Sequence, residues 1–329
     1  MSQRLRKTHT CGQLRAGDVG QAGTLMGWVH RRRTHGGLIF IDLRDRFGLT
    51  QVVFNSEVSP EAFEIAESSR PEYVLAVTGT VGRRPEANVN PSLPTGEIEL
   101  MAARAEVLNG ARTPPFEINQ DGEVEETLRL RYRYLDLRRE RVRDNILLRH
   151  RLVSAVREYL NARDFVDVET PILVLETPGG AREFLVPSRQ NPGSFYALPQ
   201  SPQQYKQLLM VGGIERYYQI ARCFRDEDSR ADRGPEFTQI DIEMSFVDQE
   251  DVLQLFEGLL LDVVPKVAPD KRIPQAPFPR LTFQESMDLY GNDKPDMRWG
   301  HTIVDLNEVF GAGFNAFDGA RATGGHVRA

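Results

Sequence analysis

Two short stretches hold the side chains whose types and spacing could do chemistry. Residues 217–246 read as two strands joined by the polar loop Asp228–Gly234. Successive side chains of a strand point to opposite faces, so one face of the second strand is predicted to carry Phe237, Gln239, Asp241 and Glu243. On the first strand Arg225 and Glu227 are two residues apart and are expected to point the same way. In the loop, Arg230 and Arg233 could meet an anion.

This combination of a guanidinium, carboxylates and an aromatic ring suits a nucleotide. Arginine binds phosphate through a planar fork of donors, and a ring can lie against a base. A half-polar sheet with ion pairs across its strands explains the same pattern, and the pattern alone leaves both interpretations open. The opposite face of the second strand is apolar and should pack against a core; its members are Thr238, Ile240, Ile242, Met244 and Phe246.

The segment before these strands contains a second group of candidate residues. Leu198–Lys206 is expected to begin as a loop and to enter a helix at Gln203–Val211. A lone lysine at a helix start is usually a solvated charge, and spacing alone favours that interpretation for Lys206. Upstream, an amphipathic helix is predicted over Asn145–Arg163, followed by a strand at Phe165–Val168.

Residues 1–110 are predicted to form an OB-type barrel. Its candidate strands are Thr24–Arg31, Gly37–Arg44, Leu49–Asn55, Tyr73–Arg83 and Glu97–Leu108, with a short helix at Pro60–Ser69 after the third strand. Such barrels bind single-stranded nucleic acid by stacking bases on aromatic rings beside basic residues. Arg31, Arg32 and Arg33 precede Phe40 here, although a solvated arginine edge beside a core phenylalanine explains the same residues.

Composition limits the remaining possibilities. The 329 residues are enough for two domains and part of a third, and residues 111–144 read as a Pro-rich and then Arg-rich hinge. A net charge of −6 argues against a protein that coats nucleic acid indiscriminately. Two cysteines provide no disulfide framework or zinc set, and no apolar run is long enough for a membrane span. We expect a cytoplasmic protein.

The amino-acid sequence of the two strands resembles motif 2 of the class II aminoacyl-tRNA synthetases, with FRDE at residues 224–227 and RGPEF at residues 233–237. The flanking segments LPQSPQQYKQLL and FTQIDIEMSF resemble the aspartyl family of bacterial and mitochondrial type. The resemblance implies an α+β protein: an N-terminal OB-fold β-barrel followed by an incomplete class II domain, an antiparallel sheet flanked by helices. The implied catalytic domain covers 145–297, with the start of an inserted domain at 298–329.

The resemblance implies activation of L-aspartate with ATP and Mg²⁺, and transfer of the aspartyl group to the 3′ end of tRNA. Arg225 is the implied catalytic residue. The implied aspartate-binding residues are Ser201, Gln203, Lys206, Arg225 and Asp241. The implied ATP-binding residues are Arg225, Asp226, Glu227, Arg233 and Phe237. The ligands of Mg²⁺ are not fixed by the sequence, and the helix and strand at 145–168 resemble motif 1, which implies a homodimer.

The barrel resembles the anticodon-binding barrel of the same family. The positions that contact anticodon bases in the family correspond to Arg33, Phe40, Gln51 and Glu99. His35, expected in the adjoining loop, and the small Ala87 resemble the relaxed version of the family, which charges tRNA(Asn) as well as tRNA(Asp).

The sequence departs from the family pattern at several places. Gly179 and Gly234 stand where many relatives have Glu and Gln, and no G-x-G-x-D/E-R pattern of motif 3 occurs in the 329 residues. We therefore expect a fragment or a truncated gene product that does not aminoacylate at a useful rate by itself. Two alternatives stay open: a non-catalytic tRNA- or nucleotide-binding protein derived from a synthetase, and a related lysyl, asparaginyl or asparagine-forming enzyme.

Overall fold

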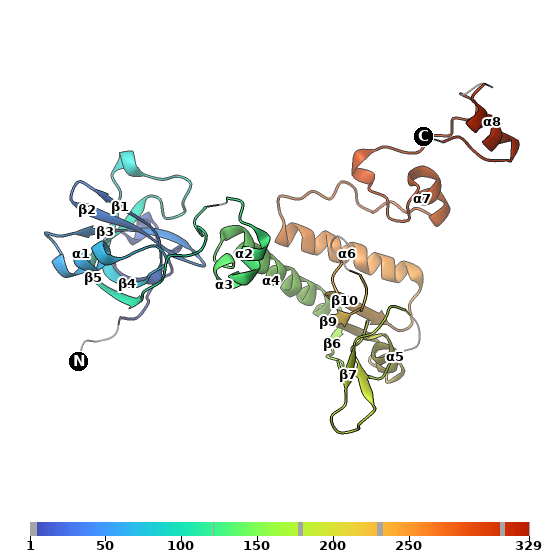
Figure 1. Cartoon of the computed structure of the whole chain (residues 1–329), viewed down its shortest axis with the longest axis horizontal. Helices are drawn as coiled ribbons and strands as arrows, with labels where there is room; N and C mark the ends of the chain where they lie inside the picture. Colours follow the sequence, from blue (N-terminus) through green and yellow to red (C-terminus); the bar gives the residue numbers. More distant parts are fainter. Residues whose placement is uncertain (1–4, 121, 177–179, 229–232, 310–312, 329) are drawn as a thin grey trace. The chain divides into compact units, whose positions relative to one another are not determined.

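The protein consists of two compact units, Met1–His150 and Arg151–Ala329. The structure is a computed structural model that describes residues 5–120, 122–176, 180–228, 233–309 and 313–328 (Figure 1). Among these residues no helix is both long and apolar enough to cross a bilayer.

The first unit contains a closed five-stranded barrel, as predicted. Its elements are β1 (Ala22–His35), β2 (Leu38–Asp45), β3 (Gly48–Asn55), α1 (Pro60–Ser68), β4 (Val74–Arg83) and β5 (Ile98–Asn109). The strands follow each other around the barrel in the order β1-β2-β3-β5-β4, and only β3 and β5 pair in parallel. Alternate apolar residues fill the interior, among them Leu25, Ile41, Val77 and Leu100, all with no exposed surface. Successive strand residues point to opposite faces, so the apolar residues at alternate positions meet in the interior.

Strand β1 is longer than predicted, which changes the place of His35. His35 is the last residue of β1 and pairs with Leu38, so the prediction that it lies in the loop was wrong. The connection consists of Gly36 and Gly37, whose φ angles are +58° and +77°. Two left-handed residues form the tight hairpin turn whose twist matches paired strands, and this lets pairing continue through the arginine run.

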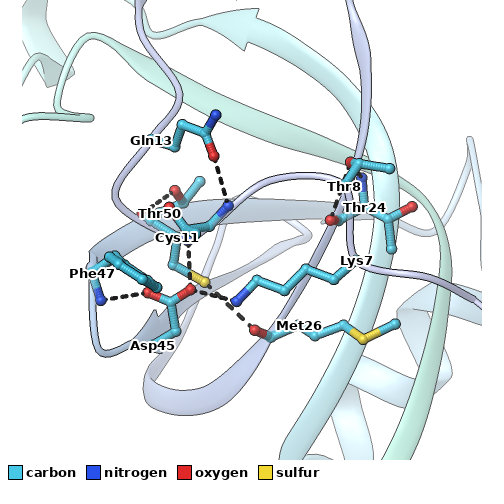
Figure 2. A network of polar contacts seen from close by, with 10 residues as sticks. Lys7, Thr8, Cys11, Gln13, Thr24, Met26, Asp45, Phe47 and Thr50 are labelled. Carbon is cyan, nitrogen blue, oxygen red and sulfur yellow. Dashed lines mark hydrogen bonds and ion pairs between the residues drawn. The ribbon is translucent and has the colours of Figure 1, made fainter.

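A buried carboxylate attaches the N-terminal segment to the barrel (Figure 2). Asp45 Oδ2 accepts hydrogen bonds from Lys7 Nζ at 2.6 Å and from the backbone N–H of Cys11 at 2.9 Å, and Oδ1 accepts one from the N–H of Phe47 at 2.8 Å. Thr50 Oγ1 donates to the carbonyl of Cys11 at 2.6 Å. Burial acts to raise the pKa of Asp45, but these donors outweigh it and lower the pKa below its ordinary value.

The charged segment after the barrel also has a buried acidic centre. It forms α2 (Glu126–Arg131), α3 (Arg133–Asp136) and α4 (Glu140–Asn161). Asp136 has no exposed surface and accepts from Arg129 Nε at 3.1 Å and from Arg133 Nη1. Several of the arginines here are therefore structural partners of this carboxylate.

The second unit is built around a small sheet in the order β10-β9-β6. Its elements are β6 (Val166–Asp167), β7 (Leu185–Pro187), β8 (Phe195–Ala197), α5 (Gln203–Val211), β9 (Arg216–Phe224), β10 (Glu236–Met244), α6 (Gln249–Val267), α7 (Phe283–Tyr290) and α8 (Asn315–Ala322). One face of β9 and β10 packs against α6 and the end of α4 through a core that includes Val156, Leu160, Tyr218 and Leu259 (Figure 1). Ile242 and Met244 pack on this core, as predicted for the apolar face.

The strand ends differ from the predictions in two places. Strand β10 ends at Met244, and Phe246 lies beyond it with φ +59° and 92% of its surface exposed, so its predicted place on the apolar face was wrong. Strand β9 ends at Phe224, so Arg225 and Glu227 are not alternating strand residues. Instead the N–H of Glu227 bonds to the carbonyl of Arg225 at 3.0 Å, which bends the chain there.

Candidate active site and nucleic-acid-binding face

The face of β9 and β10 opposite the α6 core carries the predicted polar residues. In the antiparallel register Phe237 lies opposite Cys223, Asp241 opposite Gln219 and Glu243 opposite Tyr217. Paired residues point to the same face, so both strands contribute to one polar surface. Helix α5 contacts both strands and brings Lys206 to it.

Lys206 is the centre of a buried ionic cluster. Its Nζ lies 3.0 Å from Asp241 Oδ1 and 3.2 Å from Glu243 Oε2. The Lys206 side chain is 11% exposed and that of Asp241 9%, so both charges are largely removed from water. The second oxygen of Asp241, Oδ2, is buried and has no hydrogen-bond partner among the described residues. A buried carboxylate oxygen of this kind requires a donor, which a bound ammonium group could supply.

Three further polar side chains border this cluster, and the sequence analysis did not select them. Gln219 Oε1 accepts from Tyr217 Oη at 2.8 Å and from Thr170 Oγ1 at 3.0 Å. Burial and the nearby charge of Asp241 raise the pKa of Tyr217, which keeps its hydroxyl a neutral donor. Gln219 and Tyr217 could have been found by pairing β9 with β10, because they lie opposite the two carboxylates.

The candidate nucleotide end of the surface lies at the other end of β10. Arg225 stands over the ring of Phe237, with its Cζ 5.1 Å from the ring centroid. Both line a cavity of about 510 Å³. Its other lining residues are Glu227, Asp228, Arg233, Gly234 and Lys294. Arg225 Nε is buried without a hydrogen-bond partner in the described part of the chain, so this guanidinium retains donor capacity.

One predicted ATP-binding residue is placed elsewhere. Asp226 does not line this cavity: its carboxylate lies 3.6 Å from Arg182 Nε, and its N–H bonds to the carbonyl of Arg182 at 2.8 Å. The structure thus brings together Arg225, Glu227, Arg233 and Phe237 and leaves Asp226 at the edge. Arg230 lies outside the described residues.

The segment before α5 is attached to the neighbouring loop by an amide that the sequence analysis missed. Gln200 accepts from the N–H of Ala181 at 2.9 Å and donates to its carbonyl at 2.5 Å. A Cβ on Gly180 would lie 2.8 Å from Gln200 Oε1, and its φ is +102°, so glycine is required there. Ser201 is half-buried and Gln203 is the exposed first residue of α5. Gly179 lies outside the described residues.

In the first unit the predicted anticodon residues form a connected row across the barrel. Arg33 Nη2 donates to Asp42 Oδ1 at 3.0 Å and to Gln51 Oε1 at 3.1 Å. Gln51 Nε2 then donates to Glu99 Oε2 at 2.8 Å. Phe40 pairs with Arg33 across the β1–β2 ladder and is half-buried. The row therefore places a ring beside a continuous set of donors and acceptors.

Three further residues of this barrel are Arg84, His35 and Ala87. Arg84, missed by the sequence analysis, donates from Nε to the carbonyl of Ile98 at 2.8 Å, while its Nη2 is buried without a partner among the described residues. Burial lowers the pKa of Arg84, against the opposing charges of Glu99 and Asp42, which lie near it. His35 and Ala87 are both exposed.

The fold and these sites place the chain in a known family. Residues 125–314 match the model of "tRNA synthetases class II (D, K and N)", and residues 24–108 match that of the "OB-fold nucleic acid binding domain". The chain therefore belongs to the class II tRNA synthetases of the D, K and N group. The predicted α+β fold class, with an OB barrel before a class II domain, is confirmed.

Named relatives make the likeness more specific. The chain is 58% identical over 323 residues to the aspartate–tRNA(Asp/Asn) ligase of Rubrobacter xylanophilus, covering 98% of this chain and 54% of that protein. It is also 58% identical over 325 residues to the ligase of the same name from Moorella thermoacetica, again covering 98% and 54%. The chain thus spans about half the length of the curated relatives it matches.

A solved structure has a similar fold. The asparaginyl-tRNA synthetase of Pyrococcus horikoshii, crystallised with asparaginyl-adenylate, superposes with a TM-score of 0.76 at 26% identity. The superposition covers 93% of this chain and 73% of that one. The predicted resemblance to the aspartyl family of class II synthetases is confirmed by these relatives.

Proposed function

We propose that this chain carries the aspartate- and ATP-binding surface and the anticodon-binding barrel of an aspartate–tRNA ligase. The observation that carries the proposal is the Lys206 cluster on the same face of β10 as the Arg225–Phe237 pair. Phe237 and Asp241 are four residues apart on that strand, about 13 Å at the usual rise. An elongated ligand with a base at one end and a charged amino acid at the other fits this arrangement.

At the amino-acid end, Lys206 would bind the side-chain carboxylate of aspartate. Asp241 would accept the substrate ammonium through Oδ2, which has no partner among the described residues. Ser201 and Gln203, which lie at the start of α5, would border the same substrate. A fixed ammonium favours aspartate over asparagine, because it attracts a carboxylate more strongly than a neutral amide.

At the nucleotide end, Phe237 would stack on adenine and Glu227 would contact its polar edge. Arg225 would bind the α-phosphate and hold the substrate carboxylate in line with it, and Arg233 would face the outer phosphates. In the reaction a carboxylate oxygen of aspartate forms a bond to the α-phosphorus while pyrophosphate leaves. Positioning and charge neutralisation by Arg225 supply the catalysis, since no proton transfer is needed for this step.

Magnesium would enter with the phosphates of ATP. No group of three His, Cys, Asp or Glu side chains capable of holding a metal ion occurs among the described residues. The carboxylate of Glu243 is paired with Lys206 at 3.2 Å. Mg²⁺ commonly keeps several waters and binds through substrate phosphates, so the residues present do not fit a separate protein-held site.

The barrel face would bind the anticodon, with a base stacked on Phe40 and polar edges read by Arg33, Gln51 and Glu99. Amides and carboxylates read base edges in unstacked RNA. The two relatives described above are named for both tRNA(Asp) and tRNA(Asn), and we propose the same pair of tRNAs here, with His35 and Ala87 beside the anticodon. We also propose a cytoplasmic location, where tRNA would be available as a substrate.

We further propose a homodimer formed through the region after α4. Val166, Ile172 and Leu173 are 44%, 45% and 54% exposed in the single chain. Exposed apolar residues at a strand and the following turn are typical of a surface that another chain covers. Sedimentation velocity would show whether the chain pairs.

The amino-acid end and the nucleotide end of the site can be tested separately by substitutions of Lys206 and Phe237. Replacement of Lys206 by arginine keeps the charge, and so the fold, but substitutes a planar fork for a compact ammonium. We expect Lys206→Arg to weaken L-aspartate binding to this chain at least about tenfold and to change ATP binding less than about twofold. Phe237→Leu should weaken ATP binding at least about tenfold and change L-aspartate binding less than about twofold. Both affinities are measured by isothermal titration calorimetry.

Equal losses of aspartate and ATP binding in both variants would refute the division of roles. The barrel is tested separately with transcripts of the two tRNAs, where Phe40→Ala should weaken binding of both about tenfold through lost stacking. Binding of tRNA by a chain that binds neither aspartate nor ATP would support instead a non-catalytic tRNA-binding protein.

A further inference from the structure

The Lys206 cluster contains one more negative charge than it needs. One ammonium faces the carboxylates of Asp241 and Glu243, at 3.0 Å and 3.2 Å. If aspartate binds as proposed above, its ammonium pairs with Asp241, while its side-chain carboxylate and Glu243 are two anions that compete for the one ammonium of Lys206. Two carboxylates held at one largely buried ammonium repel each other, and each weakens the pairing of the other with Lys206. One of the two protein carboxylates must therefore leave as the substrate enters.

The two carboxylates differ in how easily they can leave. The Asp241 side chain is 9% exposed, and its free Oδ2 is buried in the site. The Glu243 side chain is 29% exposed and has one more methylene group, so it can rotate into water. Its contact with Lys206 is also the longer of the two. Moving Glu243 costs little solvation, whereas moving Asp241 would remove the acceptor that the substrate ammonium needs.

We propose that Glu243 is an exchangeable counterion that occupies the place of the substrate's side-chain carboxylate when the site is empty. Bound aspartate displaces it, so that Lys206 exchanges an internal carboxylate for an external one. Asp241 remains in place throughout. This inference rests on the proposed function and assigns to Glu243 a role as an internal competitor of the substrate.

This role predicts that replacing Glu243 increases the affinity for aspartate, whereas most substitutions in a binding site decrease affinity. A residue that only supports the fold or orients Lys206 would weaken binding when it is changed. A competitor strengthens binding when it is removed, because the substrate no longer has to break an ion pair. Partly exposed pairs of this kind contribute little, so Glu243→Gln should tighten aspartate binding about two- to fivefold.

The experiment measures equilibrium binding of L-aspartate and of succinate to this chain by isothermal titration calorimetry. Succinate carries two carboxylates and no ammonium, so it reports the exchange at Lys206 without the contact at Asp241. Glu243→Gln should tighten the binding of both ligands by the same factor and leave ATP binding unchanged. Asp241→Asn is the matched control: it should weaken aspartate binding and affect succinate less.

The outcomes are distinct. Weaker or unchanged aspartate binding in Glu243→Gln, with the fold intact by circular dichroism, overturns the exchange but leaves the proposed function standing. Tighter binding of aspartate alone, without succinate, also overturns it, because the carboxylate exchange is common to both. Failure of the unmodified chain to bind either ligand overturns the proposed function and this inference together.

Discussion

The two units each hold a chain of charged and amide side chains, but they place them differently. In the second unit Lys206 and Asp241 form an ion pair with side chains 11% and 9% exposed. In the barrel the corresponding pair, Arg33 and Asp42, is 46% and 20% exposed and continues into Gln51. The interatomic distances are the same, 3.0 Å in both pairs.

The difference lies in the surroundings of the charges, and it suits two kinds of recognition. Charges removed from water interact strongly and cannot rearrange without cost, which suits selection of a small charged substrate. Exposed polar groups exchange partners with water at little cost, which suits base edges that arrive on a flexible RNA strand. Burial therefore distinguishes the two sites more than distance does.

The largest expected effect is on the buried cluster. Lys206→Met removes the cation that lies between Asp241 and Glu243, and breaking a buried pair from one side leaves an uncompensated charge. We expect the free energy of unfolding of the second unit to fall by about 3–5 kcal/mol. Hydrogen exchange at the β9 and β10 amides measures it. The triple variant Lys206→Met, Asp241→Asn, Glu243→Gln should recover most of the loss; no recovery would show that lost packing, not charge, is the cause.

The buried carboxylate of Asp45 tests whether buried charged contacts also contribute more than exposed ones in the barrel unit. Asp45→Asn loses the ion pair with Lys7 and weakens two backbone hydrogen bonds (Figure 2), which should cost about 1–3 kcal/mol. The pKa of Asp45 is lower in the folded state than in the unfolded chain. Its contribution is therefore present above about pH 4, the ordinary value, and is lost as the pH falls through the lower folded pKa.

The stability difference between the native chain and Asp45→Asn should accordingly shrink in acid. Urea unfolding followed by hydrogen exchange of the barrel strands, at neutral pH and at about pH 3, measures this change. A difference that does not change with pH would mean that the carboxylate acts by shape alone.

The smallest effect is expected for the exposed pair. A double-mutant cycle of Arg33→Ala and Asp42→Ala should give a coupling energy below about 1 kcal/mol, and increasing salt should reduce it further. Each single variant should leave the barrel folded. A coupling as large as that of Lys206 with Asp241 would remove the distinction between the two networks.

Several sequence predictions depended only on local pattern and were accurate. Strand and turn signals predicted the five barrel strands, and the helix at Gln203–Val211 was placed at its observed bounds. The errors fell at strand ends. Phe246 continues the alternation of β10 but lies past the end of that strand. His35 was expected in a loop but is the last residue of β1, directly before the two-glycine turn. Strand ends depend on where the partner strand stops, which alternation along one chain does not reveal.

The partners of the charges also could not be read from the sequence. Residues 111–144 read as an Arg-rich hinge, but only the structure shows that Arg129 and Arg133 bind the buried Asp136. Gln219, Gln200 and Arg84 were not selected, because nothing in their local sequence shows that they lie beside the sites. A side chain's role here depends on residues tens of positions away.

The sequence by itself determined the residue types and the face of each strand on which they lie, because the alternation of a strand is local. It placed Phe237, Asp241 and Glu243 on one face and Phe40 beside the arginines. Only the tertiary structure decided which charges were removed from water and which opposing groups met them. Burial requires other elements to cover a residue, as α5 brings Lys206 onto the β9–β10 face, and that depends on packing between distant segments.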